Sequence, residues 1–312
     1  MSFVLGIDGG GTKSTSVIAD LKGKVLLTEQ GGPTNIYAYS PDFVMEELKQ
    51  LFDLAMYKTG LKLNHCAALC LGSAGLDRPW DRQMMTEMIR SLGFQGTILL
   101  THDAETALEA GTEDGEGIIV ISGTGSIGFG KTKEGRKARC GGWGHIIGDE
   151  GSGYDLGVKA LKAAVRSMDG RGKPTKLLSL IREEKNLQTA EDFIRYACHT
   201  ADKKEVASIA RLVHQCYQAE DDIAKEILEE AAWELFLLAD ALLKQLHVHD
   251  RPFSVVVNGS ILLNIPFIYE KFFRYVKENH PLARVQKLKV NAAYGAVKLA
   301  LKALHGQTEN AD

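Results

Sequence analysis

The amino-acid sequence predicts an α/β protein built from two related halves, with most of its helices in the second half. Short apolar strands alternate with helical segments between residues 2 and 111, which is typical of a sheet covered by helices. A unit of strand, glycine-rich loop, strand, glycine turn and strand occurs at residues 4–29 and again from Gly117 onward. Longer helical segments follow residue 153. We therefore expect a duplicated α/β unit whose second copy is enlarged by helices.

The first half begins with three strands. Residues 2–8 form an apolar strand that ends in "GGGTK", and residues 14–20 and 24–30 are two further strands. Between the last two strands, Gly23 supplies the left-handed residue of a tight turn.

Helix signals then alternate with buried strands. Ser40 and Pro41 are the preferred residue types for the N-cap and the first position of a helix, and Gly60 is suited to ending that helix. The rest of the first half is expected to contain a strand at 66–75, a helix at 84–93, a strand at 96–103 that ends at Asp103, and a short helix at 104–111.

The second half repeats the opening unit. Its strands "GIIVIS", "IGFGKT" and "KARCGG" are separated by the loop "GTGS" and the turn "KEGR". The loop "SGTGS" corresponds to "DGGGT" and the turn "TKEGR" corresponds to "DLKGK", which indicates a duplication. The following elements are expected to be helices at 153–167 and 221–247, a strand from 253 that ends at Gly259, a strand at 283–290 and a helix at Tyr294–Leu304.

The composition is that of a soluble globular protein and excludes several classes of function. Of the 312 residues, 45% are hydrophobic and 25% are charged, and the net charge is −3. We therefore expect no nucleic-acid partner and no attraction to an anionic membrane, and no apolar run reaches the roughly 18 residues of a membrane span. The five cysteines are scattered without a C-x-x-C pair, which predicts reduced thiols in a cytoplasmic protein.

The glycine-rich loops are the most informative local motifs. "GIIVISGTGSIGFG" contains the pattern G-x-G-x-x-G, but a dinucleotide fingerprint requires a helix directly after the loop, and here a strand and a turn follow. "GIDGGGTKS" is not a Walker A loop, because Thr12 stands where that motif requires lysine and no helix follows. Clustered glycines still let backbone N–H groups close around an anion. We interpret the two loops as two parts of one triphosphate site.

Three motifs in this order, "GIDGGGTKS", "SGTGS" and "VVNGS", resemble the two phosphate loops and the adenosine loop of the sugar kinase, heat-shock protein and actin superfamily. The stretch "GGWGHIIGDEGSGYDLG" is most similar to the family of N-acetylglucosamine kinases and BadF/BadG/BcrA/BcrD-type ATPases. This resemblance covers essentially the whole chain. It implies two ribonuclease-H-like, actin-like ATPase domains with a central cleft. The first would comprise 1–115 and a C-terminal helix at about 297–312, and the second, with a helical insertion, would comprise 116–296.

The resemblance also implies a site for ATP and Mg²⁺. Asp8, at the end of the first strand, would hold Mg²⁺ through water, since this ion prefers carboxylate oxygen and keeps several waters. The residues implied at the nucleotide are Gly10, Gly11, Thr12 and Lys13 in the first loop, Gly123, Thr124 and Gly125 in the second loop, and Gly259 and Ser260 at the adenosine. The last loop, "NGS", departs from the commoner double glycine.

Asp103 is implied to be the catalytic base and to contact the attacking hydroxyl of the sugar. From its position alone it would be the N-cap of a helix, because it stands between a strand and a helix. The positive end of a helix dipole favours an ionised carboxylate, which is the form that accepts a proton from the attacking hydroxyl.

The sugar-binding residues follow from the same resemblance. It implies that Asn35 and Asp149 bind sugar hydroxyls and that Trp143 and Gly144 lie at an N-acetyl group, and Ser73 is a further candidate for the sugar pocket. An indole offers an apolar face and a glycine permits close approach of the backbone, although a tryptophan in the hydrophobic core is an equal alternative here.

The expected function is an ATP-dependent kinase that phosphorylates the 6-hydroxyl of an amino sugar. N-acetylglucosamine is the first candidate, and N-acetylmuramic acid and glucosamine are the alternatives. A second hypothesis is an ATPase that activates a partner reductase, but such activators hold an iron–sulfur cluster through cysteines, and here no cysteine stands in a glycine-rich loop. A non-catalytic sugar sensor is disfavoured because Asp103 is present. Apolar helices in the second half suggest a homodimer.

Overall fold

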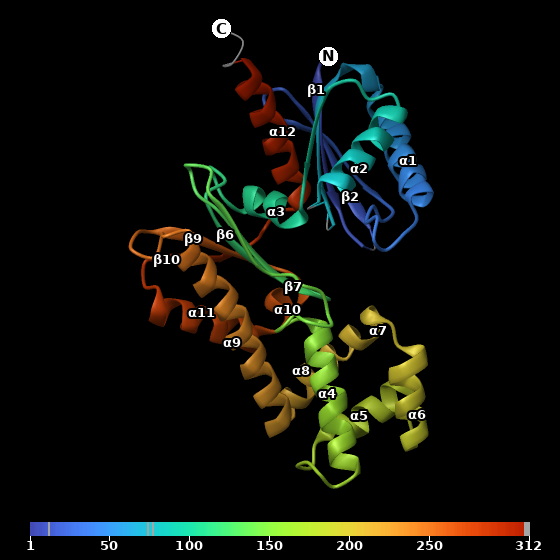
Figure 1. Cartoon of the computed structure of the whole chain (residues 1–312), viewed down its shortest axis with the longest axis vertical. Helices are drawn as coiled ribbons and strands as arrows, with labels where there is room; N and C mark the ends of the chain where they lie inside the picture. The colour runs from blue at the N-terminus through green and yellow to red at the C-terminus, as the bar shows by residue number, and fades with distance from the viewer. Residues whose placement is uncertain (12, 74, 77, 309–312) are drawn as a thin grey trace. The chain divides into compact units, whose positions relative to one another are not determined.

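The computed structural model describes residues 1–11, 13–73, 75–76 and 78–308. The chain divides into two compact units, shown in Figure 1. Unit 1 comprises Met1–Glu116 and Leu288–Asp312, and unit 2 comprises Gly117–Lys287. Unit 2 is therefore inserted into the sequence of unit 1.

Unit 1 is a mixed sheet with helices on both faces. Its strands are β1 (Phe3–Gly9), β2 (Ser14–Asp20), β3 (Val25–Gly31), β4 (Cys66–Ser73) and β5 (Thr97–Thr101). Its helices are α1 (Pro41–Thr59), the short turn η1 (Leu63–His65), α2 (Pro79–Ser91), α3 (Asp103–Gly111) and α12 (Ala292–Thr308). The strand order is β3-β2-β1-β4-β5. The first three strands of this order pair antiparallel, whereas β1, β4 and β5 run parallel.

The two faces of the unit 1 sheet have separate cores because successive residues of a strand point to opposite faces. Leu5 and Ile7 of β1 belong to the core that contains residues of α1 and α2, whereas Val4 belongs to the core formed with α12. Figure 1 shows α12 against this sheet. A Cβ atom at Gly6 would lie 2.5 Å from the backbone nitrogen of Val297, so only glycine permits this close approach of α12.

The predicted ends of α1 are confirmed. The Ser40 side chain accepts a hydrogen bond from the backbone N–H of Phe43, Pro41 occupies the first turn, and Gly60 has a φ of 66°. Helix α2 begins earlier than the expected residue 84, because Pro79 at its first position already sets helical geometry.

Unit 2 is a second mixed sheet with a larger set of helices. Its strands are β6 (Gly117–Ser122), β7 (Ser126–Lys131), β8 (Lys137–Gly141), β9 (Phe253–Asn258) and β10 (Ala283–Lys287). Its helices are α4 (Gly153–Met168), α5 (Lys176–Lys185), α6 (Ala190–Arg195), the π-helical turn η2 (Tyr196–Thr200), α7 (Lys203–Ser208), α8 (Ala210–Gln218), α9 (Asp222–Gln245), α10 (Ser260–Asn264) and α11 (Pro266–Asn279). Helix α9 packs on β6, β7 and β8 and buries Leu235 and Leu242.

The two sheets have the same topology. The order β8-β7-β6-β9-β10 in unit 2 matches β3-β2-β1-β4-β5 in unit 1. In both sheets the first three strands pair antiparallel, and the first strand of the unit then pairs parallel with a later strand. The prediction of two related ribonuclease-H-like α/β units, with a helix-rich second unit, is confirmed.

Candidate active site

The predicted residues fall into two groups, one in each unit. Unit 1 carries Asp8, Gly10, Gly11, Lys13, Asn35, Ser73 and Asp103. Unit 2 carries Gly123, Thr124, Gly125, Trp143, Gly144, Asp149, Gly259 and Ser260. Thr12, predicted at the nucleotide, lies outside the described residues. Each group is built by its own sheet.

In unit 1 the parallel strands bring polar residues to one edge of the sheet. In the parallel pairing of β1 with β4, Asp8 lies opposite Gly72 and Gly9 lies opposite Ser73. Gly72 in turn lies opposite Thr101 at the end of β5. Asp103 follows as the first residue of α3. The carboxyl ends of β1, β4 and β5 therefore place Asp8, Ser73 and Asp103 at the same edge.

Asp8 and Asp103 interact electrostatically across this edge. Burial, followed by the negative charge of Asp103, raises the pKa of Asp8 from about 3.8 to about 7, and the charge of Lys13 acts in the opposite direction. A buried carboxylate beside a second negative charge is an arrangement that a cation neutralises. The described residues contain no group of three or more His, Cys, Asp or Glu side chains that could hold a metal.

The start of α3 differs from the expectation. His102, not Asp103, is the N-cap, and its Nδ1 atom accepts a hydrogen bond 3.1 Å long from the backbone N–H of Glu105. Asp103 is the first helical residue, and its Oδ1 atom accepts from the N–H of Ala104 at 3.0 Å. Histidine is an uncommon N-cap, which is why the aspartate was favoured from the sequence. Asp103 still lies in the first turn, where the helix dipole stabilises negative charge.

The loop between β1 and β2 closes on itself. The N–H of Gly10 donates to the carbonyl of Lys13 at 3.0 Å, and the carbonyl of Gly10 accepts from the N–H of Thr34 at 3.3 Å. A Cβ atom at Gly9 would lie 2.2 Å from the Thr34 hydroxyl, so glycine is required. That buried hydroxyl has no hydrogen-bond partner among the described residues.

Asn35 organises the loop after β3. Its Oδ1 atom accepts from the N–H of Tyr37 at 2.9 Å, and its carbonyl accepts from the N–H groups of Ala38 and Tyr39. No described residue accepts a hydrogen bond from the Asn35 side-chain NH₂ group. This group has two donors available for a ligand hydroxyl.

In unit 2 the loop between β6 and β7 lies against the N-terminus of α4. The N–H groups of Gly153 and Tyr154 donate to the carbonyls of Gly123 and Thr124, at 2.8 and 3.2 Å. Within the part of the chain that the structure describes, the N–H groups of Thr124 and Gly125 donate to no acceptor. These two donors can bind an anion, as successive backbone amides in turns do.

The loop after β9 adjoins the loop after β6, because the two strands are parallel neighbours. Gly259 has a φ of 94°, and a Cβ atom there would lie 2.2 Å from the carbonyl oxygen of Ser122. Only glycine fits this position. A Cβ atom at Gly123 would lie 3.9 Å from the Ser260 hydroxyl, so the predicted phosphate and adenosine loops of unit 2 are in contact range.

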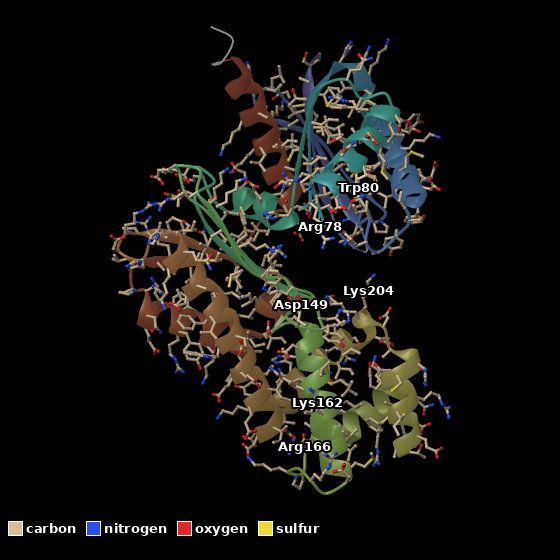
Figure 2. The ribbon with its side chains drawn as sticks, viewed as in Figure 1. Arg78, Trp80, Asp149, Lys162, Arg166 and Lys204 are labelled. Atoms are coloured by element: carbon tan, nitrogen blue, oxygen red, sulfur yellow. The ribbon has the colours of Figure 1, made fainter. Side chains whose placement is uncertain are left out.

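Asp149 is a buried carboxylate beside the β6–β7 loop and is labelled in Figure 2. It is 4% exposed and has a φ of 63°, an uncommon conformation for a residue with a side chain. Its Oδ1 atom accepts from the N–H of Ser126 at 3.2 Å, and its Oδ2 atom accepts from Lys203 Nζ at 2.7 Å. Lys203 was not predicted as a site residue.

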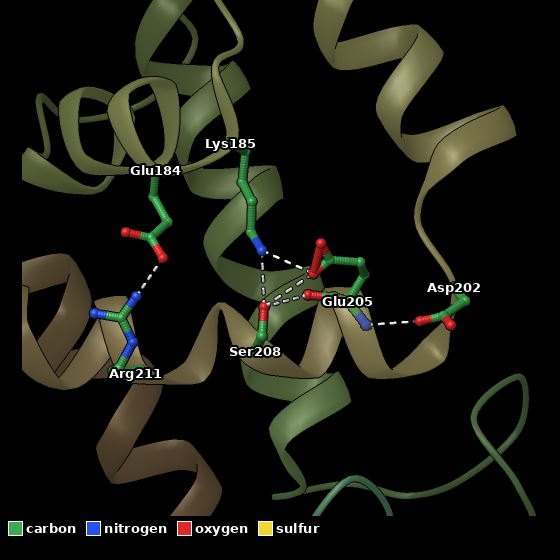
Figure 3. A network of polar contacts seen from close by, with 6 residues as sticks. All are labelled: Glu184, Lys185, Asp202, Glu205, Ser208 and Arg211. Carbon is green, nitrogen blue, oxygen red and sulfur yellow. Dashed lines mark hydrogen bonds and ion pairs between the residues drawn. The ribbon is translucent and has the colours of Figure 1, made fainter.

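Helix α7, which carries Lys203, is fixed by polar and apolar contacts. Its N-cap Asp202 accepts from the N–H of Glu205 at 2.7 Å, and Lys185 of α5 contacts Glu205 and Ser208 at 2.8 and 2.9 Å (Figure 3). A Cβ atom at Gly157 of α4 would lie 2.0 Å from the carbonyl oxygen of Val206, so α4 and α7 are in very close contact. The polar network and the close packing together hold Lys203 at Asp149.

Trp143 is not a core residue. Its side chain is 69% exposed, and the guanidinium carbon of Arg139 lies 5.7 Å from the centre of its ring. Gly144 has a φ of 85°. Ile146 and Ile147 are also highly exposed. The indole face is therefore available to a ligand.

The five cysteines are distributed over both units. All five are free thiols, and Cys66, Cys70 and Cys216 are buried. Burial raises the pKa of Cys66 to about 12 and that of Cys216 to about 11, while Cys140 is half-buried and Cys198 is exposed.

The fold and the glycine loops define an α/β protein of the actin-like ATPase fold class. The sequence profile of the BadF/BadG/BcrA/BcrD ATPase family matches residues 5–300, and the chain belongs to this family.

Three relatives are similar over nearly the whole chain. An N-acetylmuramic acid/N-acetylglucosamine kinase from Clostridium acetobutylicum is 45% identical over 96% of this chain and 98% of its own length. An N-acetyl-D-glucosamine kinase from Dictyostelium discoideum is 28% identical over 95% of this chain and 97% of its own length. The structure of a Chromobacterium violaceum protein assigned as an N-acetylglucosamine kinase superposes with a TM-score of 0.78, at 24% identity, over 96% of this chain and 99% of that chain.

Proposed function

We propose that the chain is an ATP-dependent kinase that transfers the γ-phosphoryl group of ATP to the 6-hydroxyl of an amino sugar. The observation that carries the proposal is the pair Asp8 and Asp103 at the carboxyl edge of the unit 1 sheet, where burial and the charge of Asp103 raise the pKa of Asp8. A phosphoryl-transfer site needs one group to act on the cation and another to accept the proton of the nucleophile. The names of the Clostridium and Dictyostelium relatives support an amino sugar as the acceptor.

Asp103 acts as the general base in this proposal. It accepts the proton of the 6-hydroxyl while that oxygen bonds to the γ-phosphorus, and the bond to the bridging oxygen of ADP breaks. Asp8 would hold Mg²⁺ through water, and the bound cation would neutralise the charge of the phosphates. The carboxylate chemistry of Asp8 and the glycine-lined loop beside it suit this ion.

The remaining predicted residues bind the two substrates. Gly10, Gly11, Thr12 and Lys13 of unit 1 and Gly123, Thr124, Gly125, Gly259 and Ser260 of unit 2 bind ATP, and the two donors at Thr124 and Gly125 support a phosphate contact. Asn35, Ser73, Asp103, Trp143, Gly144 and Asp149 bind the sugar, and the donor pair of Asn35 and the exposed indole of Trp143 support this role.

N-acetylglucosamine is the first candidate substrate. The exposed Trp143 and the backbone at Gly144 suit an N-acetyl group, because an indole packs against a methyl group and glycine permits close approach. N-acetylmuramic acid is the second candidate, and glucosamine, which lacks the acetyl group, is the third.

A coupled assay of ADP release across glucose, glucosamine, N-acetylglucosamine, N-acetylmannosamine and N-acetylmuramic acid tests the proposal. We expect turnover with N-acetylglucosamine and a 6-phosphate product identified by NMR. Asp103→Asn should lower kcat about 10²–10⁴-fold, the usual contribution of a general base. Asp53→Asn, on an exposed position of α1, is the matched control. Normal turnover in the Asp103 variant would remove the assigned base.

We also propose that the chain works in the cytoplasm as a homodimer. None of the described helices has the length and apolar character that crossing a membrane requires. Free thiols and the need for ATP suit the cytoplasm. Trp233 of α9 and Phe273 of α11 are exposed aromatic residues on two helices that pack together. Light scattering coupled to gel filtration measures the oligomeric state directly.

A further inference from the structure

Arg78 and Tyr37 form an exposed pair in unit 1, at the end of the loop that follows β4. The guanidinium carbon of Arg78 lies 5.9 Å from the centre of the Tyr37 ring. The Tyr37 side chain is 60% exposed, and Arg78 is exposed as well. The Arg78 guanidinium also interacts with the Tyr37 hydroxyl. A guanidinium has five N–H donors, so others remain for a ligand beside this cation–π contact.

A hydrogen bond to a buried carboxylate fixes the position of the Tyr37 side chain. The Tyr37 hydroxyl donates to Asp81 Oδ2 at 2.8 Å, and Asp81, in the first turn of α2, is only 4% exposed. This hydrogen bond raises the pKa of Tyr37, and Arg78 acts in the opposite direction. The Tyr37 side chain therefore lies between the buried carboxylate of Asp81 and the exposed guanidinium of Arg78 and contacts both.

Tyr37 also contacts Asn35, the predicted sugar-binding residue in the loop after β3. The N–H of Tyr37 donates to Asn35 Oδ1 at 2.9 Å. A Cβ atom at Gly75 would lie 2.5 Å from the Tyr37 ring and 3.8 Å from Asn35 Oδ1. The loop after β3 and the loop after β4 thus meet at Tyr37, and Arg78 lies at the rim of the residues that include Asn35 and Ser73.

The chemistry of this rim favours a negatively charged ligand. Among the described residues, no carboxylate lies within ion-pair distance of Arg78. Arg78 precedes Pro79 at the N-terminus of α2, which adds the positive end of a helix dipole. Trp80, which Figure 2 labels together with Arg78, lies two residues further along the chain in the first turn of α2 and is a 71% exposed apolar side chain. A planar carboxylate attached to an apolar group matches this combination.

We propose that Arg78, supported by Tyr37 and Asp81, binds the carboxylate of an acidic substituent on the amino sugar and thereby determines acceptance of N-acetylmuramic acid. This inference rests on the proposed kinase function. N-acetylmuramic acid differs from N-acetylglucosamine by a lactyl ether, which consists of one methyl group and one carboxylate. The guanidinium fork pairs with the carboxylate, and the exposed aromatic residues beside it suit the methyl group.

The test compares kcat/KM for N-acetylmuramic acid with kcat/KM for N-acetylglucosamine in purified full-length variants. Arg78→Gln should lower kcat/KM for N-acetylmuramic acid relative to kcat/KM for N-acetylglucosamine about 10–100-fold. This is the usual contribution of a hydrogen bond to a charged group. Arg78→Lys should retain part of the ratio, because lysine keeps the charge and loses the fork. Arg274→Gln is the matched control, since that guanidinium lies 5.8 Å from the Tyr275 ring on α11.

A second readout uses salt. Raising the ionic strength should increase KM for N-acetylmuramic acid in the wild-type chain and change it much less in Arg78→Gln, because screening weakens an exposed ion pair. An unchanged ratio, or equal loss with both sugars, would overturn the inference and assign Arg78 to the nucleotide or to the surface. A wild-type chain that phosphorylates only N-acetylglucosamine overturns it too. A wild-type chain that phosphorylates neither sugar overturns the proposed function itself, and the inference with it.

Discussion

Asp8 should destabilise the ligand-free protein, and Asp8→Asn should relieve that cost. Burial and the charge of Asp103 raise the pKa of Asp8 from about 3.8 to about 7, so the folded protein holds its proton more tightly than the unfolded chain does. Between these two values the unfolded state releases a proton that the folded state keeps. Stability therefore falls as the pH rises from about 4 to about 7 and then levels off.

The size of the effect follows from the shift. At 1.36 kcal/mol per pKa unit, ionised Asp8 destabilises the folded state by up to about 4 kcal/mol above pH 7. At pH 5 most of this cost is absent, because the folded-state carboxyl is still protonated, and the difference between pH 5 and pH 8 is about 2–3 kcal/mol. For a unit of this size that difference corresponds to about 5–10 °C in Tm.

The assay is thermal unfolding at pH 5 and pH 8 without nucleotide or Mg²⁺. Asp8→Asn should unfold above the wild type at both pH values, by a clearly larger margin at pH 8 than at pH 5, while losing kinase activity. Asp53→Asn controls for the loss of one negative charge at an exposed position. Parallel curves for the wild type and Asp8→Asn across this pH range would refute the reasoning, because the substitution removes the carboxyl whose titration it invokes.

Three further outcomes follow from the geometry of unit 2. Gly259→Ala should reduce stability by about 2–4 kcal/mol and abolish nucleotide binding, since a methyl group meets the Ser122 carbonyl; urea unfolding measures the first effect and nucleotide titration the second. Lys203→Met should reduce stability by about 1–3 kcal/mol, because it leaves the buried Asp149 without its cation, and a second Asp149→Asn change should restore part of the loss in Tm. Leu235→Ala should cost about 2–5 kcal/mol in urea unfolding, whereas a smaller loss would mean that the core around α9 collapses into the cavity.

Local signals in the sequence predicted most of the fold. Strand alternation, the paired glycine turns at Gly23 and Gly135, and the Ser40–Pro41 helix start depend on neighbouring residues and could be read directly. The duplication was readable because both copies keep the loop and turn residues in the same order. Helices α5 to α8 were not predicted, since they are short, and helices of this length are stabilised by packing more than by their own periodicity.

The positions of site residues could be predicted only for residues that directly follow a strand, because the pairing of the strands then places them. Asp8, Ser73 and Asp103 follow buried strands, so their placement at one sheet edge follows from parallel pairing. Lys203 was missed because 54 residues separate it from Asp149 and its helix carries no glycine motif. The contact between Arg78 and Tyr37 was missed for the same reason, because it depends on two loops that meet only after the sheet has formed.

Because α12 follows unit 2 in the sequence, the order of synthesis matters for unit 1. A nascent chain that has released β1 to β5 from the ribosome still lacks the helix that covers Val4, Val17 and Cys70. That apolar sheet face stays open to solvent during translation of the whole inserted unit, and such surfaces attract chaperones or aggregate. A frameshift before Ala292 would leave the face uncovered permanently, even though every residue proposed to touch a substrate had already been made.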